Sequence, residues 1–570
     1  MALALASCTK QAPKPESADL VVLYTTDVHG ACLPYDFKQN QPARTSLANV
    51  YTYVKQEREK TPESVMLFDT GDFLQGQPSI YYYNFVDTTA QHVAARVYNF
   101  MEYDAVGVGN HDIEPGEAVY NRHLPNMLNM PWLCANAVDT RTGEPMFKPY
   151  CVLNRQGVKI AVLGLITPHI HAWLPKSLWP NLEFEDMVEC AQKWVPIIKE
   201  KENPDILIGL FHAGGDYEVD GNTIDTRFNE NGAIPVAIKV PGFDIVLIGH
   251  DHSKRNIDVV NVAGDTVKVL DANTQARLIG RADIHLSLNA DGTYSKTITT
   301  YLIDSEQFEP EPSFCTEFQA DINKVNEYVD SPIGTLTADL EGINGLYGPC
   351  AFMDLIHDAQ LWAIKADVSM AAVLSPYDKI PAGQITMRHL FTIYKYENQL
   401  FTLSMSGADI KKYLEFGFSN QFATMKKIGD PLIKRVDGRP VTPSFNYTSA
   451  AGIKYTVDLT KPAGERVTIL SMSDGTPFDL EKDYRVAVNS YQASGGGNFI
   501  PVGLGWNNET LAAHTLDTTP IDVRRYVASY IKEQGSITPH IRGDWEIIPT
   551  AFWEVGKAQE IANSGNRNYR

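Results

Sequence analysis

Five short polar motifs each follow directly after an apolar run of strand length, and this arrangement constrains the fold more than any other feature. The runs cover residues 20–24, 65–68, 105–108, 206–211 and 245–248. In α/β proteins, functional side chains gather outside the carboxyl ends of the strands. We therefore expect strands in these five places, with the five motifs converging on one point.

The motifs contain nitrogen and oxygen donors that are typical of metal sites. They read Asp27-Val-His29, Asp69-Thr-Gly-Asp72, Gly109-Asn110-His111-Asp112, His212 and Gly249-His250-Asp251-His252. A single motif of this kind is more often a capping or core group than a ligand, but the conjunction of five favours a metal site. A mixed set of imidazole, carboxylate and amide groups suits zinc, manganese or iron. Magnesium and calcium, which prefer oxygen, stay open as alternatives.

These motifs support a resemblance to a known family. Residues 20–300 resemble the calcineurin-like metallophosphoesterase domain, and the whole chain resembles the periplasmic 5′-nucleotidase and 2′,3′-cyclic-nucleotide phosphodiesterase family. The resemblance implies an α/β (α+β) fold. Its first part would be a four-layer metallophosphoesterase β-sandwich flanked by helices, and a linker helix would join it to a separate α/β substrate-binding domain.

The same resemblance implies two divalent metal ions. One would be held by Asp27, His29, Asp72 and His252, and the other by Asp72, Asn110, His212 and His250. Asp72 would then bridge the two ions. In two-metal sites, cations roughly 3.5–4 Å apart activate a water molecule and neutralise charge on the phosphoryl group.

Further residues near the motifs are candidates for catalysis or support. His111 resembles the family histidine that stabilises the transition state or protonates the leaving oxygen, a role worth roughly a hundredfold or more. The alternative is a histidine that only supports a ligand. Glu114 stands where some family members carry an aspartate that orients this histidine. We expect Asp69 to steer a ligand imidazole or a loop amide, and we assign no metal to Asp112 or Asp251.

The chain is too long for one hydrophobic core, so at least two domains are expected in its 570 residues. An acidic, proline-containing segment at 304–312 precedes apolar positions at helical spacing over 313–329. The predicted organisation is a leader remnant and tether at 1–18, the phosphoesterase domain at 19–303, a linker with its helix at 304–332, the substrate-binding domain at 333–550 and a tail at 551–570.

Charge and cysteine usage restrict the partners and the location. A formal net charge of −20 disfavours nonspecific binding to nucleic acid, so we expect no stable nucleic-acid partner. The family resemblance implies a nucleotide substrate, and we expect a monomer. Leu5-Ala-Ser-Cys8 resembles the bacterial lipobox, although the preceding segment is short for a signal peptide. The alternative for Cys8 is a free cysteine in a tail. These features predict a protein of the bacterial cell envelope, either periplasmic or an outer-membrane lipoprotein, that touches a membrane only through Cys8.

Motifs in the C-terminal half resemble landmarks of the family's substrate domain. Tyr396 and Tyr491 occupy positions at which family members carry two aromatics that sandwich the base. Stacking of this kind contributes roughly 1–3 kcal/mol per base. The alternative is that both tyrosines belong to the core. The remaining candidate contacts to substrate are Asn398, Gly495, Gly496 and Gly497.

This chain departs from the 5′-nucleotidase pattern, and the departures indicate which substrate it prefers. Those enzymes place an arginine of a Gly-Ile-Arg segment against the substrate, but residues 374–378 here read Leu-Ser-Pro-Tyr-Asp. The pattern favours hydrolysis of 2′,3′-cyclic nucleotides to 3′-nucleotides and then to nucleosides and phosphate. A 5′-nucleotidase or nucleotide-sugar hydrolase on the same scaffold is the alternative. A catalytically inactive surface-binding protein is a more remote one.

Overall fold

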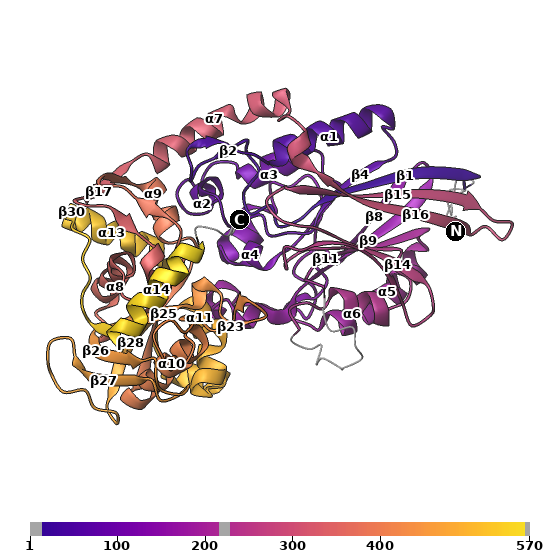
Figure 1. Ribbon diagram of the computed structural model, residues 1–570. Coiled ribbons are helices and arrows are strands. Elements are labelled where there is room, and N and C mark those ends of the chain that lie inside the picture. Colours follow the sequence, from indigo (N-terminus) through magenta and orange to yellow (C-terminus); the bar gives the residue numbers. More distant parts are fainter. Residues whose placement is uncertain (1–13, 216–228, 565–570) are drawn as a thin grey trace. The chain divides into compact units, whose positions relative to one another are not determined.

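The computed structural model describes residues 14–215 and 229–564, which fold into two compact units (Figure 1). Within the described ranges, the first unit contains the chain up to Ile170 and from Lys176 to Val325. The second contains His171–Pro175 and the chain from Asn326 onward. Cys8 and the proposed lipid anchor lie outside the described residues. Among the described helices, none combines the length and the apolar character needed to cross a lipid bilayer.

The first unit contains two six-stranded sheets. One sheet has the order β16-β15-β1-β4-β5-β6. Strands β1, β4, β5 and β6 are parallel to one another, and β15 runs antiparallel to both of its neighbours, β1 and β16. Its strands are β1 Ser17–Thr25, β4 Val65–Asp69, β5 Ala105–Gly107, β6 Trp132–Leu133, β15 Leu278–Leu288 and β16 Tyr294–Asp304. The parallel strands all end at the same edge of this sheet.

The second sheet has the order β13-β14-β12-β11-β9-β8, with antiparallel strands at both of its edges. Its strands are β8 Tyr150–Arg155, β9 Val158–Ile166, β11 Ile206–His212, β12 Ile245–Ile248, β13 Lys254–Val260 and β14 Thr266–Ala272. Apolar side chains from both sheets form one core, to which β1 contributes Val22 and β11 contributes Ile208. The two sheets therefore pack face to face.

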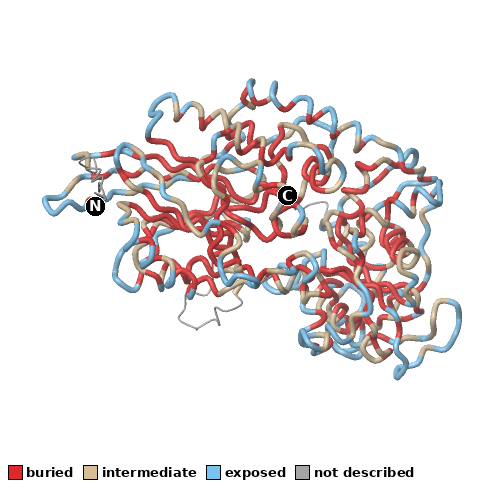
Figure 2. The backbone as a smooth tube through the Cα atoms, turned by 180° about the vertical axis from the view of Figure 1, so that it is seen from behind, coloured by how far each residue is buried: buried red, intermediate tan, exposed pale blue. Residues whose placement is uncertain are grey.

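Helices cover the outer faces of this sandwich (Figure 1). On the first sheet lie α1 Leu47–Lys60 and α3 Val93–Phe100, and on the second lie α5 Met187–Glu202 and α6 Ala233–Lys239. Figure 2 shows buried residues concentrated along the strands, with exposed residues mainly in loops and on the outer sides of helices. The arrangement of helices, sheet, sheet and helices confirms the predicted four-layer sandwich.

All five predicted apolar runs lie in strands. The run at 245–248 coincides with β12, and the other four lie in β1, β4, β5 and β11, with the last residue of 105–108 just beyond β5. Three of these strands belong to the first sheet and two to the second. The polar motifs therefore reach the site from both layers of the sandwich.

The predicted helix at 313–329 is confirmed as α7 Pro312–Val329. Phe314 and Phe318 on this helix are fully buried, and both rings contact Phe100 of α3. Asp321 accepts hydrogen bonds from Tyr83 and Arg96. The first part of α7 is therefore packed into the first unit, and the boundary between the units falls within the helix, after Val325.

The second unit is built on a five-stranded sheet of order β25-β19-β28-β22-β29, beside two three-stranded sheets of orders β21-β17-β30 and β27-β26-β31. The strands of the large sheet are β19 Val368–Ala372, β22 Gln399–Ser406, β25 Thr448–Ala451, β28 Asp483–Asn489 and β29 Thr515–Asp522. Those of the smaller sheets are β17 Pro332–Leu336, β21 Gly383–Thr386, β26 Ile453–Asp458, β27 Val467–Met472, β30 Ser536–Ile537 and β31 Trp545–Ile548. The main helices are α8 Ala351–Ile364, α9 Met387–Ile393, α10 Gly407–Gln421, α13 Val523–Gln534 and α14 Thr550–Ser564. Their apolar faces share one hydrophobic core, so this unit confirms a separate α/β domain.

Candidate metal centre

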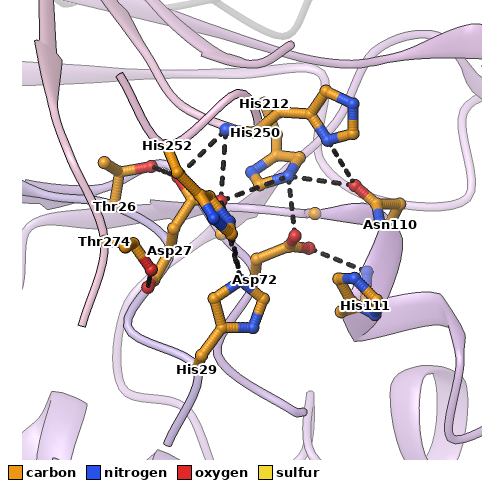
Figure 3. Close-up of polar contacts among 12 residues, drawn as sticks. Thr26, Asp27, His29, Asp72, Asn110, His111, His212, His250, His252 and Thr274 are labelled. Carbon is orange, nitrogen blue, oxygen red and sulfur yellow. Dashed lines mark hydrogen bonds and ion pairs between the residues drawn. The ribbon is translucent and has the colours of Figure 1, made fainter. Parts of the chain in front are cut away.

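The five motifs meet at one point of the first unit (Figure 3). Two groups of side chains that could each hold a metal ion lie there, and within each group the ligand atoms are no more than 4.8 Å apart. One group is Asp27, His29 and His252; the other is Asp72, His212 and His250. All six residues were predicted from the sequence as site residues, and the structure brings them together.

The first group is compact. The Nε2 atoms of His29 and His252 are 3.0 Å apart, and Asp27 Oδ1 lies 3.3 Å from His252 Nε2 and 3.9 Å from His29 Nε2. Two imidazole nitrogens and a carboxylate oxygen therefore point at a common position. Such a mixed set of nitrogen and oxygen donors is suited to zinc, manganese or iron.

The second group includes an amide as well. His212 Nε2 lies 3.0 Å from Asp72 Oδ2 and 3.1 Å from Asn110 Oδ1, and His250 Nδ1 lies 2.9 Å from the same oxygen of Asn110. Asp27 Oδ1 is 4.0 Å from His212 Nε2, so the two groups adjoin. The amide oxygen of Asn110 thus lies within hydrogen-bond distance of both histidines of this group.

The electrostatics of the centre suit metal binding. Burial lowers the pKa of His29 and that of His250 to about 4, which keeps both imidazoles in the neutral form that binds metals. Burial would also lower the pKa of His212, but the carboxylate of Asp72 raises it to about 9. Burial opposes ionisation of Asp72, yet His212 and His111 hold its pKa well below the usual range. His29 and His250 therefore offer neutral nitrogen donors and Asp72 an anionic oxygen, whereas His212 has to lose its proton to bind a metal.

Five of the donor residues have left-handed backbone conformations. The φ angles are 49° for Asp27, 46° for His29, 61° for Asp72, 79° for His250 and 52° for His252. A non-glycine residue in this region costs of order 1–3 kcal/mol when its surroundings hold it there. Strain of this kind is concentrated at functional sites, and nothing in the residue spacing indicated it.

Two motif glycines permit close approach of the loops. A Cβ atom on Gly109 would lie 2.1 Å from Asp72 Oδ1. A Cβ atom on Gly249 would lie 1.9 Å from Thr26 Oγ1 and 2.5 Å from Asp27 Oδ2. Any side chain at either position would therefore displace a donor carboxylate.

Asp112 organises the loop that carries Asp72. Its buried carboxylate accepts hydrogen bonds from the backbone N–H groups of Gly109, Asp72, Phe73 and Leu74, at 2.8–3.0 Å. The carboxylate thus ties the Asp72 loop to the start of α4 Asn110–Ile113. Asp112 therefore fixes the backbone of the loop that carries Asp72.

Asp69 and Asp251 also bind loop amides. Asp69 accepts hydrogen bonds from the Gly71 N–H at 2.8 Å and from the Thr25 hydroxyl at 2.5 Å, which confirms that it steers a loop amide. Asp251 accepts a hydrogen bond from the Gly215 N–H at 3.0 Å and forms an ion pair with Arg255. Both carboxylates support the loops around the donors.

His111 and Glu114 form a pair beside the two groups. Nδ1 of His111 lies 2.5 Å from Oε2 of Glu114, and the His111 N–H donates to Asp72 Oδ1 at 2.7 Å. The His111 side chain is 29% exposed, whereas that of Glu114 is 9% exposed. A partly exposed histidine oriented by a buried carboxylate has the geometry of a general acid.

The second unit contains the predicted substrate contacts. Tyr491 has a ring contact with Phe445, with centroids 6.2 Å apart and an interplanar angle of 76°. Phe445 was not predicted from the sequence; it lies in the short 3₁₀ helix Ser444–Asn446 before β25 and is 37% exposed. Tyr396 is half-buried against the core, and the nearly buried Asn398 donates a hydrogen bond to the Tyr394 hydroxyl at 3.4 Å.

The glycine run lies next to the same aromatic pair. A Cβ atom on Gly496 would lie 2.5 Å from the Tyr491 ring, and one on Gly497 would lie 2.7 Å from Asn446 Oδ1. Gly495 and Gly497 both have positive φ angles, of 112° and 68°. Asn446 is 8% exposed, and its Oδ1 has no hydrogen-bond partner within the protein. The glycines therefore allow their backbone to lie close to Tyr491 and Asn446.

Comparisons with known proteins agree with this geometry. Residues 20–254 match the family described as calcineurin-like phosphoesterase, and residues 332–502 match the 5′-nucleotidase C-terminal domain. A site built from these motifs on a helix-covered β-sandwich defines a metallophosphoesterase. The chain belongs to the family in which this domain is joined to a 5′-nucleotidase C-terminal domain, and it is a phosphoric ester hydrolase.

Several relatives share most of the chain. A 2′,3′-cyclic-nucleotide 2′-phosphodiesterase/3′-nucleotidase of Haemophilus influenzae is 27% identical over 93% of this chain and 88% of its own. A 5′-nucleotidase of Vibrio parahaemolyticus is 26% identical over 92% of this chain and 94% of its own. The trifunctional nucleotide phosphoesterase protein YfkN of Bacillus subtilis is 25% identical over 93% of this chain, which spans only 39% of that relative.

A solved structure shares the fold. It is a Staphylococcus aureus protein described as a candidate 5′-nucleotidase, with a TM-score of 0.76 and 23% sequence identity over 93% of this chain and 100% of its own. This similarity extends over both units and confirms the two-domain fold.

Proposed function

We propose that the protein hydrolyses 2′,3′-cyclic nucleotides to 3′-nucleotides and then removes the 3′-phosphate. The observation that carries this proposal is the meeting of the two donor groups beside the His111–Glu114 pair. The first step breaks the bond between phosphorus and O2′, and the second breaks the bond between phosphorus and O3′. One site serves both steps because the same groups hold the phosphorus.

The residues present fit two divalent metal ions. In this proposal Asp27, His29, Asp72 and His252 hold one ion, and Asp72, Asn110, His212 and His250 hold the other. The neutral imidazoles of His29 and His250 and the ionised carboxylate of Asp72 support the assignment. When bound, such a pair of ions activates water and neutralises charge on the phosphoryl oxygens. We favour zinc, manganese or iron, with magnesium and calcium as alternatives.

His111 acts on the leaving oxygen in this mechanism. Glu114 accepts a hydrogen bond from Nδ1 of His111 and so fixes the orientation of the ring. The protonated imidazole then donates its Nε2 proton to the oxygen that leaves phosphorus. Glu114 stabilises the positive charge of the ring before the transfer, as a carboxylate beside a catalytic histidine does.

Aromatic side chains of the second unit bind the base. Tyr491 supplies one ring, and Phe445 is the ring that the structure places beside it. Tyr396 remains the candidate from the sequence for the second ring, and Asn398, Gly495, Gly496 and Gly497 remain candidate contacts. The unpartnered Asn446 Oδ1 offers an acceptor near the same pair. Base stacking on aromatic faces tolerates different bases, which suits an enzyme of nucleotide catabolism.

A 5′-nucleotidase is the second candidate, because relatives with that name align with most of the chain. The absence of arginine from residues 374–378 favours cyclic and 3′-nucleotides instead. A metal-reconstituted activity panel tests the choice with 2′,3′-cyclic AMP, 3′-AMP, 5′-AMP and a nucleotide sugar. We expect the highest kcat/KM with 2′,3′-cyclic AMP. Preference for 5′-AMP or a nucleotide sugar would select the alternative, and no turnover by the metal-loaded protein would indicate a binding protein.

We also propose a monomer in the bacterial cell envelope, anchored through a lipid on Cys8. Lipidation at Cys8 predicts that the protein partitions into detergent when it is expressed in a bacterial host, and that Cys8→Ser abolishes this partitioning. Light scattering coupled to size-exclusion chromatography measures the molar mass. The chain mass is 63.4 kDa, so a value near twice this mass would contradict a monomer.

A further inference from the structure

A loop outside the metal-binding motifs holds the backbone of Asp27. It comprises residues 273–276 and follows β14. The Thr274 hydroxyl donates to the carbonyl oxygen of Asp27 at 2.8 Å (Figure 3). The Gln275 N–H donates to the same oxygen at 2.8 Å. This one carbonyl therefore accepts two hydrogen bonds from a loop almost 250 residues further along the chain.

The opposite side of Asp27 is held as well. Its N–H donates to the Gly71 carbonyl at 3.0 Å, and the His29 N–H donates to the Asp72 carbonyl at 2.9 Å. Both Asp27 and His29 have left-handed backbone conformations, which non-glycine residues disfavour. With its N–H and C=O both bound, Asp27 keeps this conformation only while the two flanking loops hold it.

The loop itself is rigidly anchored. Asn273, Gln275 and Ala276 have φ angles of 66°, 58° and 54°. The Thr45 hydroxyl donates to the Gln275 carbonyl at 3.1 Å, and the Ser305 hydroxyl donates to the Ala276 carbonyl. Three non-glycine residues in the left-handed region, tied to distant parts of the unit, mark the loop as a fixed support.

We propose that Thr274 is a positioning residue of the metal centre. Its hydroxyl, together with the Gln275 amide, keeps Asp27 in the left-handed conformation that points its carboxylate toward His252. Without the hydroxyl, Asp27 retains only one of the two hydrogen bonds to its carbonyl, and the carboxylate moves away from its partners more easily. This inference rests on the proposed role of Asp27 as a metal donor.

The test measures Zn²⁺ binding to the metal-free protein by calorimetric titration, with two sites fitted. Thr274→Val removes the hydroxyl and keeps the shape of the side chain. We expect it to weaken one site about five- to tenfold, the effect of losing one hydrogen bond, and the other less than about twofold. Thr274→Ser restores the hydroxyl and the affinity. Thr300→Val is the matched control. The Thr300 hydroxyl on edge strand β16 donates to Asn256 on edge strand β13, and neither residue is among the metal donors.

Two results overturn the proposal. One is a Thr274→Val protein with both affinities unchanged. The other is equal weakening of both sites together with a lower unfolding temperature of the metal-free protein, which marks general destabilisation. If Thr274→Val does not fold, Thr274→Ala is measured against the same expectations.

Asp27→Asn separates this inference from the proposed metal centre. If Asp27→Asn loses one site and Thr274→Val loses no affinity, the positioning role alone fails. If Asp27→Asn binds both ions as the unmodified protein does, the assignment of Asp27 as a donor fails, and the role of Thr274 fails with it.

Discussion

The candidate sites of the two units differ in how far their main side chains are buried. In the first unit Asp27 and His212 are completely buried and Asp72 is 1% exposed, and five donor residues have left-handed backbone conformations. In the second unit Phe445 is 37% exposed and lies in the short 3₁₀ helix Ser444–Asn446, whereas Tyr396 is half-buried. Most metal donors are therefore buried and several have a strained backbone, although the His252 side chain is 45% exposed, whereas Phe445 of the proposed base site is open to solvent.

The difference follows from what each site has to do. Metal donors and a proton donor act only when their atoms lie within a few tenths of an ångström of the productive positions. Backbone strain is the cost of that placement, and buried carboxylates such as Asp112 hold the loops against it. A base that stacks on aromatic rings tolerates displacement, because stacking depends weakly on lateral position.

The largest expected effect is at Asp72, which is proposed to be shared by the two metal ions. Asp72→Asn removes the charge that both proposed ions share, so we expect turnover of 2′,3′-cyclic AMP to fall at least about a thousandfold, corresponding to several kcal/mol of lost stabilisation. Asp251→Asn removes a carboxylate that holds a loop, for which a loss of about 10- to 100-fold is typical. Steady-state kinetics at saturating metal measures both. Comparable losses in the two variants would contradict the special role of Asp72.

A smaller effect is expected at His111. His111→Gln removes the proton donor, so kcat for 3′-AMP should fall about a hundredfold or more while both metals stay bound. The p-nitrophenolate leaving group of bis-p-nitrophenyl phosphate needs no proton, so its hydrolysis should change much less. Glu114→Gln is expected to show the same pattern in weaker form. Equal losses on both substrates would mean that His111 only supports the donor loops.

The open surface should show moderate losses that depend on the substrate. Tyr491→Ala removes one stacking ring, and we expect a loss of about 1–3 kcal/mol in kcat/KM for cyclic nucleotides with little change for bis-p-nitrophenyl phosphate. Phe445→Ala and Tyr396→Ala, measured in parallel, identify the second ring. We expect the larger loss at Phe445, which contacts Tyr491. If all three variants behave like the unmodified protein, the proposed base site is wrong.

The two units should not differ in how one buried histidine in the core of each affects the free energy of unfolding. Burial lowers the pKa of His92 in the first unit and that of His357 in the second to about 3. The unfolded chain takes up these protons below about pH 6.5, so stability is complete above that pH and falls as the pH drops toward 3, by at most about 1.4 kcal/mol per pH unit for each histidine.

Denaturant unfolding at several pH values tests this expectation with His92→Gln and His357→Gln. Each variant should flatten the dependence of the free energy of unfolding on pH between 6.5 and 4, by a similar amount. An unchanged slope in both variants would show that these histidines are protonated in the folded protein.

The sequence indicated the strands and the donors because these depend on local patterns. Apolar runs predict buried strands, and a polar motif directly after a run predicts a residue at the edge of a sheet. Thus β12 was predicted residue for residue, and His250 and His252 were placed beside it. The four-layer sandwich followed from the family resemblance that these motifs support.

What the sequence did not indicate depends on contacts between distant loops. The left-handed conformation of Asp27 is held by Gly71 and Thr274, and no spacing within one motif reports that contact. Phe445 was missed because its partner Tyr491 lies in α11 Ser490–Ala493, which is distant in the sequence. Thr274 and Phe445 are residue types that occur throughout the chain, and only the folded structure brings each of them to a candidate site.

The central claim is that two metal ions share Asp72 at the point where the five motifs meet. Anomalous diffraction from crystals of the reconstituted protein, recorded at the absorption edge of the bound metal, tests it most directly. The account predicts two peaks about 3.5–4 Å apart, one next to His29 and His252 and the other next to His212 and His250, with Asp72 between them. A single peak, or peaks remote from these residues in crystals of protein active on 2′,3′-cyclic AMP, would contradict it.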